Sequence, residues 1–169
     1  MIETILWDVD GTLLDFAAAE AAAIRRLFAE HGLGDCTEEM LRRYSAINKR
    51  WWERLERGEV TRMQVLEGRF REFFTAEGLD ASLAPAFNER YQVCLGDTIV
   101  YRDDSLAIVC ALRGRVRQYA VSNGTVVAQE KKLRLSGLGA LMDGVFLSEE
   151  LGVEKPDPAF FDRVFSAIG

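Results

Sequence analysis

The stretch Glu3-Thr-Ile-Leu-Trp-Asp-Val-Asp-Gly-Thr-Leu-Leu-Asp15 begins with an apolar run and then becomes acidic at Asp8 and Asp10. A short apolar run of this kind predicts a buried strand over residues 3–9. Gly11 follows the acidic pair directly and indicates a turn at that end of the strand. We therefore expect a strand that carries two carboxylates at its carboxyl end.

Four amphipathic helices are predicted after this strand, with no strand between them. The first is the Ala-rich segment 17–30, which ends at a glycine. The second runs from Thr37, a plausible N-cap, to Gly58. The third begins with a capping-box pattern at Thr61, and the fourth opens at Asp80. Consecutive helices with apolar faces predict a helical bundle inserted after the first strand.

Strands and helices alternate again in the last third of the chain. Apolar runs predict further strands within residues 116–122 and 143–148, and helical patterns cover residues 125–136 and 157–168. Another helix, ending at Arg113, is expected to take Asp103 as its cap. This βαβ alternation predicts a parallel sheet and an α/β fold.

Polar side chains follow all three predicted strands. In parallel sheets, ligands bind beyond the carboxyl ends of the strands. Paired carboxylates suit a hard divalent cation, whereas an ammonium, a hydroxyl and loop N–H groups suit a phosphate. A carboxylate facing phosphorus can act as a nucleophile, and a second one can protonate the leaving oxygen and activate water. The side chains expected to meet at this edge are those of Asp8, Asp10, Thr12, Ser122, Asn123 and Lys155.

Each of these residues also has a simpler interpretation. The two acids can be solvated turn residues, and Ser122-Asn123-Gly124 can be an ordinary strand-to-helix turn. Lys155 can be a surface lysine. Together, however, the acids, the Gly11-Thr12 turn and the two matching strand ends favour a site for phosphoryl chemistry.

Composition narrows the classes of partner. The chain has 169 residues, with 27 acidic and 21 basic side chains, and its net charge of −6 argues against binding to nucleic acid. No apolar stretch approaches about 18 residues, so no membrane partner is expected. The start of the chain does not resemble a secretory signal. Three widely spaced cysteines are typical of reduced thiols in a cytoplasmic protein.

Three motifs, in order, resemble those of the haloacid dehalogenase (HAD) superfamily. They are Asp8-Val-Asp-Gly-Thr12, Val121-Ser-Asn-Gly124 and Gly152-Val-Glu-Lys-Pro-Asp-Pro158. The resemblance implies a Rossmann-like core over residues 1–15 and 99–169, and a helical C1 cap over residues 16–98. It also implies Asp8 as the nucleophile and Asp10 as the acid/base. Ser122 and Asn123 would then bind phosphate, Lys155 would anchor charge, and Mg²⁺ would bind the Asp8 carboxylate and the Asp10 carbonyl.

Within that superfamily the sequence is most similar to the pyrimidine 5′-nucleotidase subgroup. The similarity lies in Leu14-Asp-Phe16, in the segment from Asn48 to Thr61 and in Ser148-Glu-Glu-Leu-Gly-Val-Glu-Lys155. It implies a small phosphorylated metabolite as substrate, with nucleoside monophosphates as one class. By position, Phe16, Asn48 and Trp52 are expected to lie near the substrate cleft, although paired tryptophans in such a helix more often serve the cap core.

One motif of the superfamily has no counterpart. A fourth, acidic motif follows the helix after Lys155 in that superfamily, whereas this chain ends at Gly169. From the apparent truncation we expect a bare edge on strand 3–9, weak Mg²⁺ binding, poor hydrolysis and self-association through that edge. Two other interpretations stay open, namely a non-catalytic remnant, either a truncated gene product or a partner-binding module, and a mutase of the same superfamily.

Overall fold

The computed structural model describes residues 2–169, which form two compact units. The core unit comprises residues 2–19 together with Gly96–Gly169, and the helical unit comprises Glu20–Leu95. One boundary falls inside the first helix, and the other falls directly after the fourth. The domain limits expected from the sequence, at residues 15–16 and 98–99, stay predictions.

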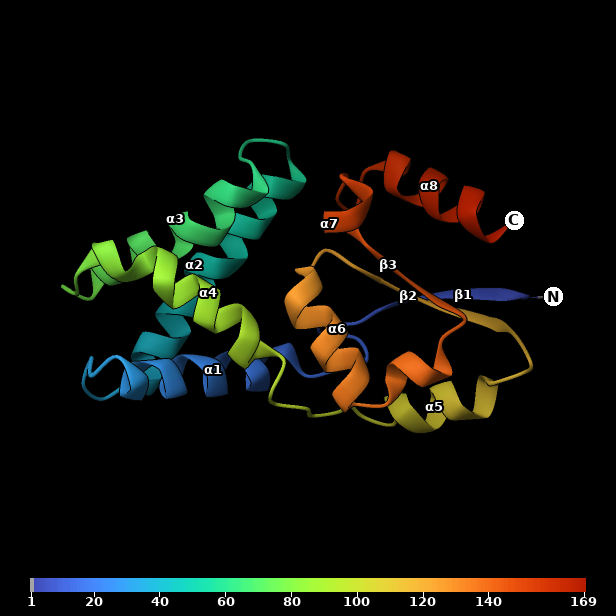
Figure 1. Ribbon diagram of the computed structural model, residues 1–169, viewed down its shortest axis with the longest axis horizontal. Helices are drawn as coiled ribbons and strands as arrows, with labels where there is room; N and C mark the ends of the chain where they lie inside the picture. Colours follow the sequence, from blue (N-terminus) through green and yellow to red (C-terminus); the bar gives the residue numbers. More distant parts are fainter. Residues whose placement is uncertain (1) are drawn as a thin grey trace. The chain divides into compact units, whose positions relative to one another are not determined.

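The core unit is built on a parallel three-stranded sheet (Figure 1). Its strands are β1 (Thr4–Asp8), β2 (Arg117–Ser122) and β3 (Gly144–Leu147), with β2 in the centre. The predicted α/β fold with a parallel sheet is confirmed. Among the described residues β1 pairs only with β2, so it lies at an edge of this sheet.

Helices cover both faces of this sheet, as Figure 1 shows. Ala120 of β2 packs on one face against Val109 and Leu133, whereas Val121 packs on the other against Phe160 and Val164. Neighbouring side chains of a strand point to opposite faces, so one central strand serves two apolar layers. The helices of the core unit are α5 (Ser105–Leu112), α6 (Val126–Leu135), α7 (Ser148–Leu151) and α8 (Pro158–Ile168), with the short 3₁₀ helix η2 (Leu138–Leu141) after α6.

Two helices of the core unit, α6 and α8, begin with a side-chain cap. The Thr125 hydroxyl accepts from the Ala128 N–H at the start of α6, and the Asp157 carboxylate accepts from the Ala159 N–H at the start of α8. The assignment of Asp103 as a cap is wrong. Asp104 occupies the cap position of α5 without a side-chain hydrogen bond, and Asp103 takes a left-handed conformation (φ 47°) in the preceding turn.

The helical unit packs around buried aromatic rings. The Tyr44 and Phe70 rings stack with centroids 5.0 Å apart, and Phe87 contacts both Phe70 and Phe74 at 5.0 Å. All four rings are fully buried, and such contacts add to the free energy of burial. The helices are α1 (Phe16–Glu30), which begins in the core unit, α2 (Glu38–Glu56), α3 (Arg62–Ala76) and α4 (Ala84–Leu95), with the 3₁₀ helix η1 (Ala81–Leu83) before α4.

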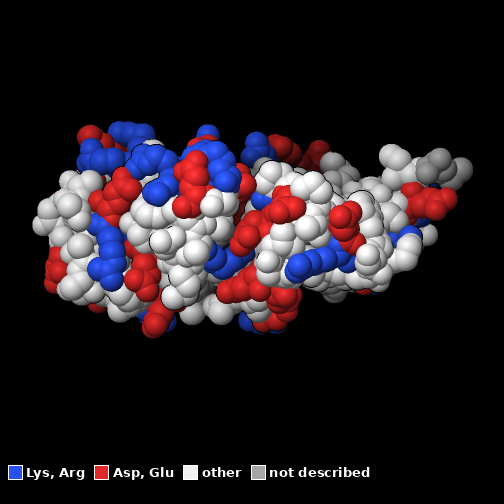
Figure 2. Space-filling model, turned by 90° about the horizontal axis from the view of Figure 1, so that it is seen from above, with Lys and Arg blue, Asp and Glu red and all other residues white. Residues whose placement is uncertain are grey.

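The surface carries charges of both signs. Basic and acidic side chains are interspersed over the face drawn in Figure 2. Many of them form exposed ion pairs within the helical unit, such as Arg25 with Glu38 and Arg50 with Glu72. Exposed pairs of this kind contribute little to stability. Over residues 2–169, no helix combines the length and apolar character that crossing a membrane requires.

Candidate active site

The register of the sheet brings the predicted motifs together at the carboxyl ends of its strands. Asp8 is the last residue of β1 and pairs with Val121, and Ser122 is the last residue of β2 and pairs with Leu147. The carboxyl ends of all three strands therefore lie side by side. Beyond β1 the chain turns at Gly11, whose φ of 85° suits glycine and whose N–H donates to the Leu14 carbonyl at 2.8 Å.

The loop after β1 is held from a distant segment. The Arg102 guanidinium donates to the Gly11 carbonyl at 2.9 Å, and the Ser105 hydroxyl donates to the Leu13 carbonyl at 2.7 Å. The Arg102 N–H also donates to Leu13, at 3.1 Å. These bonds fix the backbone that carries Asp8 and Asp10.

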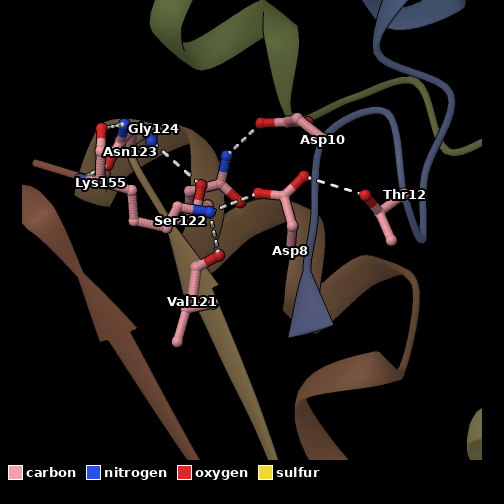
Figure 3. Close-up of polar contacts among 9 residues, drawn as sticks. Asp8, Asp10, Thr12, Val121, Ser122, Asn123, Gly124 and Lys155 are labelled. Atoms are coloured by element: carbon pink, nitrogen blue, oxygen red, sulfur yellow. Dashed lines mark hydrogen bonds and ion pairs between the residues drawn. The ribbon is translucent and has the colours of Figure 1, made fainter. Parts of the chain in front are cut away.

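Asp8 lies between a cation and a hydroxyl (Figure 3). The Lys155 ammonium is 2.6 Å from Asp8 Oδ1 and also donates to the Val121 carbonyl at 3.0 Å. The Thr12 hydroxyl donates to Asp8 Oδ2 at 3.1 Å. The Asp8 side chain is 41% exposed, so its carboxylate is accessible to a ligand while its orientation is held.

The motif after β2 ties the loops together. Asn123 Nδ2 donates to the Lys155 carbonyl and Asn123 Oδ1 accepts from the Lys155 N–H, both at 2.8 Å. The Ser122 hydroxyl accepts from the Gly124 N–H at 3.0 Å and keeps its own proton as a donor. The Asn123 side chain thus positions Lys155, a contact that the sequence did not indicate.

Asp10 has two partners that the sequence analysis missed. Gln129 Nε2 donates to Asp10 Oδ2 and Lys132 Nζ donates to Asp10 Oδ1, each at 2.5 Å. Both partners lie on α6 three residues apart and are buried. The sequence did offer one signal for these partners. Gln129 and Lys132 lie on the same face of the helix as the apolar residues Ala128 and Leu133.

The three residues assigned to a substrate cleft occupy different surroundings. The Phe16 ring centroid is 5.2 Å from Lys132 Nζ in the core unit. Asn48 is buried in the helical unit, where it donates to Glu20 at 2.8 Å and accepts from Arg69 at 2.8 Å. The Trp52 ring N–H donates to Asn48 as well, at 3.1 Å. Their role in a cleft stays a prediction.

The oxygen atoms at the carboxyl ends of the strands suit magnesium better than a metal that needs many protein ligands. Residues 2–169 contain no group of three or more His, Cys, Asp or Glu side chains placed to hold a metal ion. Mg²⁺ needs only one or two carboxylates and keeps several waters. Each Asp8 oxygen has one protein partner and further lone pairs, so this carboxylate can accept such an ion.

Comparison with known proteins identifies the family. The family model for haloacid dehalogenase-like hydrolases matches residues 2–169. The chain belongs to this family of hydrolases. The superfamily resemblance seen in the three motifs is therefore confirmed, and so is the assignment as a hydrolase.

Two kinds of curated relative are similar over nearly the whole chain. The HAD-hydrolase YfnB of Bacillus subtilis is 35% identical over 98% of this chain and 69% of its own length. The pyrimidine 5′-nucleotidase PynA of Streptococcus pneumoniae is 32% identical, covering 97% of this chain and 69% of its own. The pyrimidine 5′-nucleotidase YjjG of Escherichia coli is 28% identical over 98% of this chain and 71% of its own.

Solved structures give the same fold. The crystal structure of YfnB bound to magnesium has a TM-score of 0.92 and 34% identity, and the alignment covers 98% of this chain and 73% of that one. The L-2-haloacid dehalogenase of Xanthobacter autotrophicus has a TM-score of 0.72 at 20% identity over 100% and 66% of the two chains. The second similarity supports the fold alone.

Proposed function

We propose that this family member is a Mg²⁺-dependent phosphomonoester hydrolase that works through an aspartyl-phosphate on Asp8. The arrangement of Asp8 carries the proposal. Its accessible carboxylate is fixed by Lys155 and Thr12 at the carboxyl end of β1, and a second carboxylate lies two residues away. A reactive group that is held yet accessible is what in-line attack on phosphorus requires.

The reaction divides into two halves. In the first, an Asp8 carboxylate oxygen bonds to phosphorus, the ester P–O bond breaks, and Asp10 gives its proton to the departing alcohol. In the second, Asp10 takes a proton from water, which attacks phosphorus, and the bond to Asp8 breaks to release phosphate. Asp10 thereby returns to its starting protonation state.

The remaining motif residues bind and orient. The Lys155 ammonium balances the charge of Asp8 and of the incoming phosphoryl oxygens, and the Thr12 and Ser122 hydroxyls are donors for those oxygens. The Asn123 side chain keeps Lys155 in place by hydrogen bonds to the Lys155 backbone. Mg²⁺, held by the Asp8 carboxylate and the Asp10 carbonyl, would neutralise charge that develops on the phosphoryl group.

We further propose a small phosphorylated metabolite as the substrate, with nucleoside 5′-monophosphates as the first class to test. Support comes from the two relatives named pyrimidine 5′-nucleotidase, which align with almost all of this chain. The magnesium in the YfnB crystal structure supports the choice of cation. Self-association through the β1 edge stays a prediction.

The test is phosphate release by the purified chain with and without Mg²⁺. Substrates are p-nitrophenyl phosphate, a panel of nucleoside 5′-monophosphates and sugar phosphates. We expect Asp8→Asn to abolish turnover, because an amide is a poor nucleophile. With a substrate labelled in its phosphoryl group, the label should become bound to wild type as the alcohol departs, and hydroxylamine should release it, as expected for an acyl phosphate.

Asp162→Asn is the matched control. Asp162 is an exposed residue of α8 outside the three motifs, so this variant should keep wild-type turnover. Mg²⁺-independent turnover, or turnover that survives Asp8→Asn, would refute the proposal. Absence of any turnover in wild type would favour the non-catalytic interpretation.

A further inference from the structure

We infer that Gln129 and Lys132 are positioning residues for Asp10, which hold its carboxylate in the orientation that proton transfer needs. The inference rests on the proposed function, because it concerns the group to which we assign the proton. It goes beyond the three motifs, since both residues lie within α6 and outside them.

The geometry engages both oxygens of Asp10. Gln129 Nε2 binds Oδ2 and Lys132 Nζ binds Oδ1, each at 2.5 Å. A carboxylate held at both oxygens cannot rotate about its side-chain bonds without losing a charge-assisted hydrogen bond. Each oxygen still has a lone pair free to carry a proton, so the contacts orient Asp10 without blocking its chemistry.

Burial argues that these contacts serve a purpose other than stability. The Lys132 side chain is 1% exposed, and Gln129 is fully buried. Gln129 Oε1 has no hydrogen-bond partner among residues 2–169. A buried ion pair and an unpaired buried carbonyl stabilise a fold less than apolar side chains of the same volume would. Apolar residues would therefore suit this face of α6 better if packing were their only role.

Two neighbouring residues make room for, or contact, the side chains of Gln129 and Lys132. A methyl group on Gly124 would lie 2.3 Å from Gln129 Nε2, so only glycine leaves room for the glutamine to cross to Asp10. The Phe16 ring centroid lies 5.2 Å from Lys132 Nζ, a favourable cation–π distance. The turn after β2 and the start of α1 thus both support the contacts with Asp10.

The decisive experiment compares two leaving groups. A poorly acidic alcohol needs a proton from Asp10 as it departs, whereas p-nitrophenolate does not. We therefore expect Lys132→Met to lower kcat/KM about 10- to 100-fold for an alkyl phosphate and far less for p-nitrophenyl phosphate. The losses of kcat/KM that Asp10→Asn shows on the two substrates are the reference for this comparison. Gln129→Met should also lose more kcat/KM for the alkyl phosphate than for p-nitrophenyl phosphate. This variant tests the inference if Lys132→Met does not fold.

Lys131→Met is the matched control. It makes the same substitution at the adjacent position of α6, where the lysine forms an ion pair with Asp97. This variant should treat both substrates as wild type does. An equal loss on both substrates in Lys132→Met would show a merely structural role and overturn the inference.

A second measurement does not depend on activity. In metal-free protein, the free energies of unfolding of Lys132→Met, Asp10→Asn and the double variant should be non-additive, because the two side chains contact each other. Additive effects would overturn the inference. If wild type hydrolyses no ester, the proposed function fails while this cycle still decides whether Lys132 holds Asp10.

Discussion

Replacing Gly124 by alanine should disconnect Gln129 from Asp10. The new methyl carbon would lie 2.3 Å from Gln129 Nε2 and 2.9 Å from its Cδ and Cγ atoms. None of these separations is possible between non-bonded atoms, and Gln129 is buried, so its carboxamide must move off Asp10 rather than swing into solvent.

The magnitude follows from two opposing effects. Losing a hydrogen bond to a charged group costs about 1.5–3 kcal/mol. Exchanging glycine for alanine restricts the unfolded chain and returns about 0.4–1 kcal/mol. The net destabilisation is about 1–2 kcal/mol, which for a protein of this size lowers Tm by about 2–8 °C.

Thermal and urea unfolding measure this change, and Gln129→Ala supplies the matched control. Shortening residue 129 removes the obstruction, so Gly124→Ala combined with Gln129→Ala should be less destabilised than the sum of the two single variants. If Gly124→Ala is as stable as wild type, or if the two effects simply add, then the contact between these residues does not exist as described.

Two further predictions concern the helical unit. Burial raises the pKa of the Tyr44 and Tyr91 phenols, so the folded state binds their protons more tightly than the unfolded state does. Stability should therefore fall as the pH rises past about 10, and urea unfolding of Tyr44→Phe should show a shallower loss in that range; an unchanged slope would contradict this. Thr61 and Gln64 form a capping box at the start of α3, so Thr61→Ala should cost about 1 kcal/mol in urea unfolding, whereas Thr61→Ser should cost little. Equal losses in the alanine and serine variants would argue against the cap.

Local sequence patterns were sufficient to predict the strands and most of the helices. The apolar run before Asp8 and the alternation after residue 100 predicted the three parallel strands that the structure contains. Because the carboxyl ends of parallel strands lie at the same end of a sheet, the sequence predicted that Asp8 and Lys155 come together, although 147 positions separate them. The prediction of Asp103 as a cap failed because Asp103 takes a left-handed conformation in the turn before α5, whereas a capping residue is typically extended.

The amino-acid sequence alone therefore determined the three parallel strands, the family motifs and the end of the sheet where they meet, because these follow from periodicity and from residues next to strand ends. Only the tertiary structure decided what holds Asp10. Gln129 and Lys132 lie 119 and 122 positions away from it, and they reach it from a helix face whose neighbours are apolar. Which polar side chain on such a face meets which carboxylate depends on how α6 packs against the loop after β1. That packing is set by the whole core, in which each buried group must find a partner or bear the cost of lost hydration.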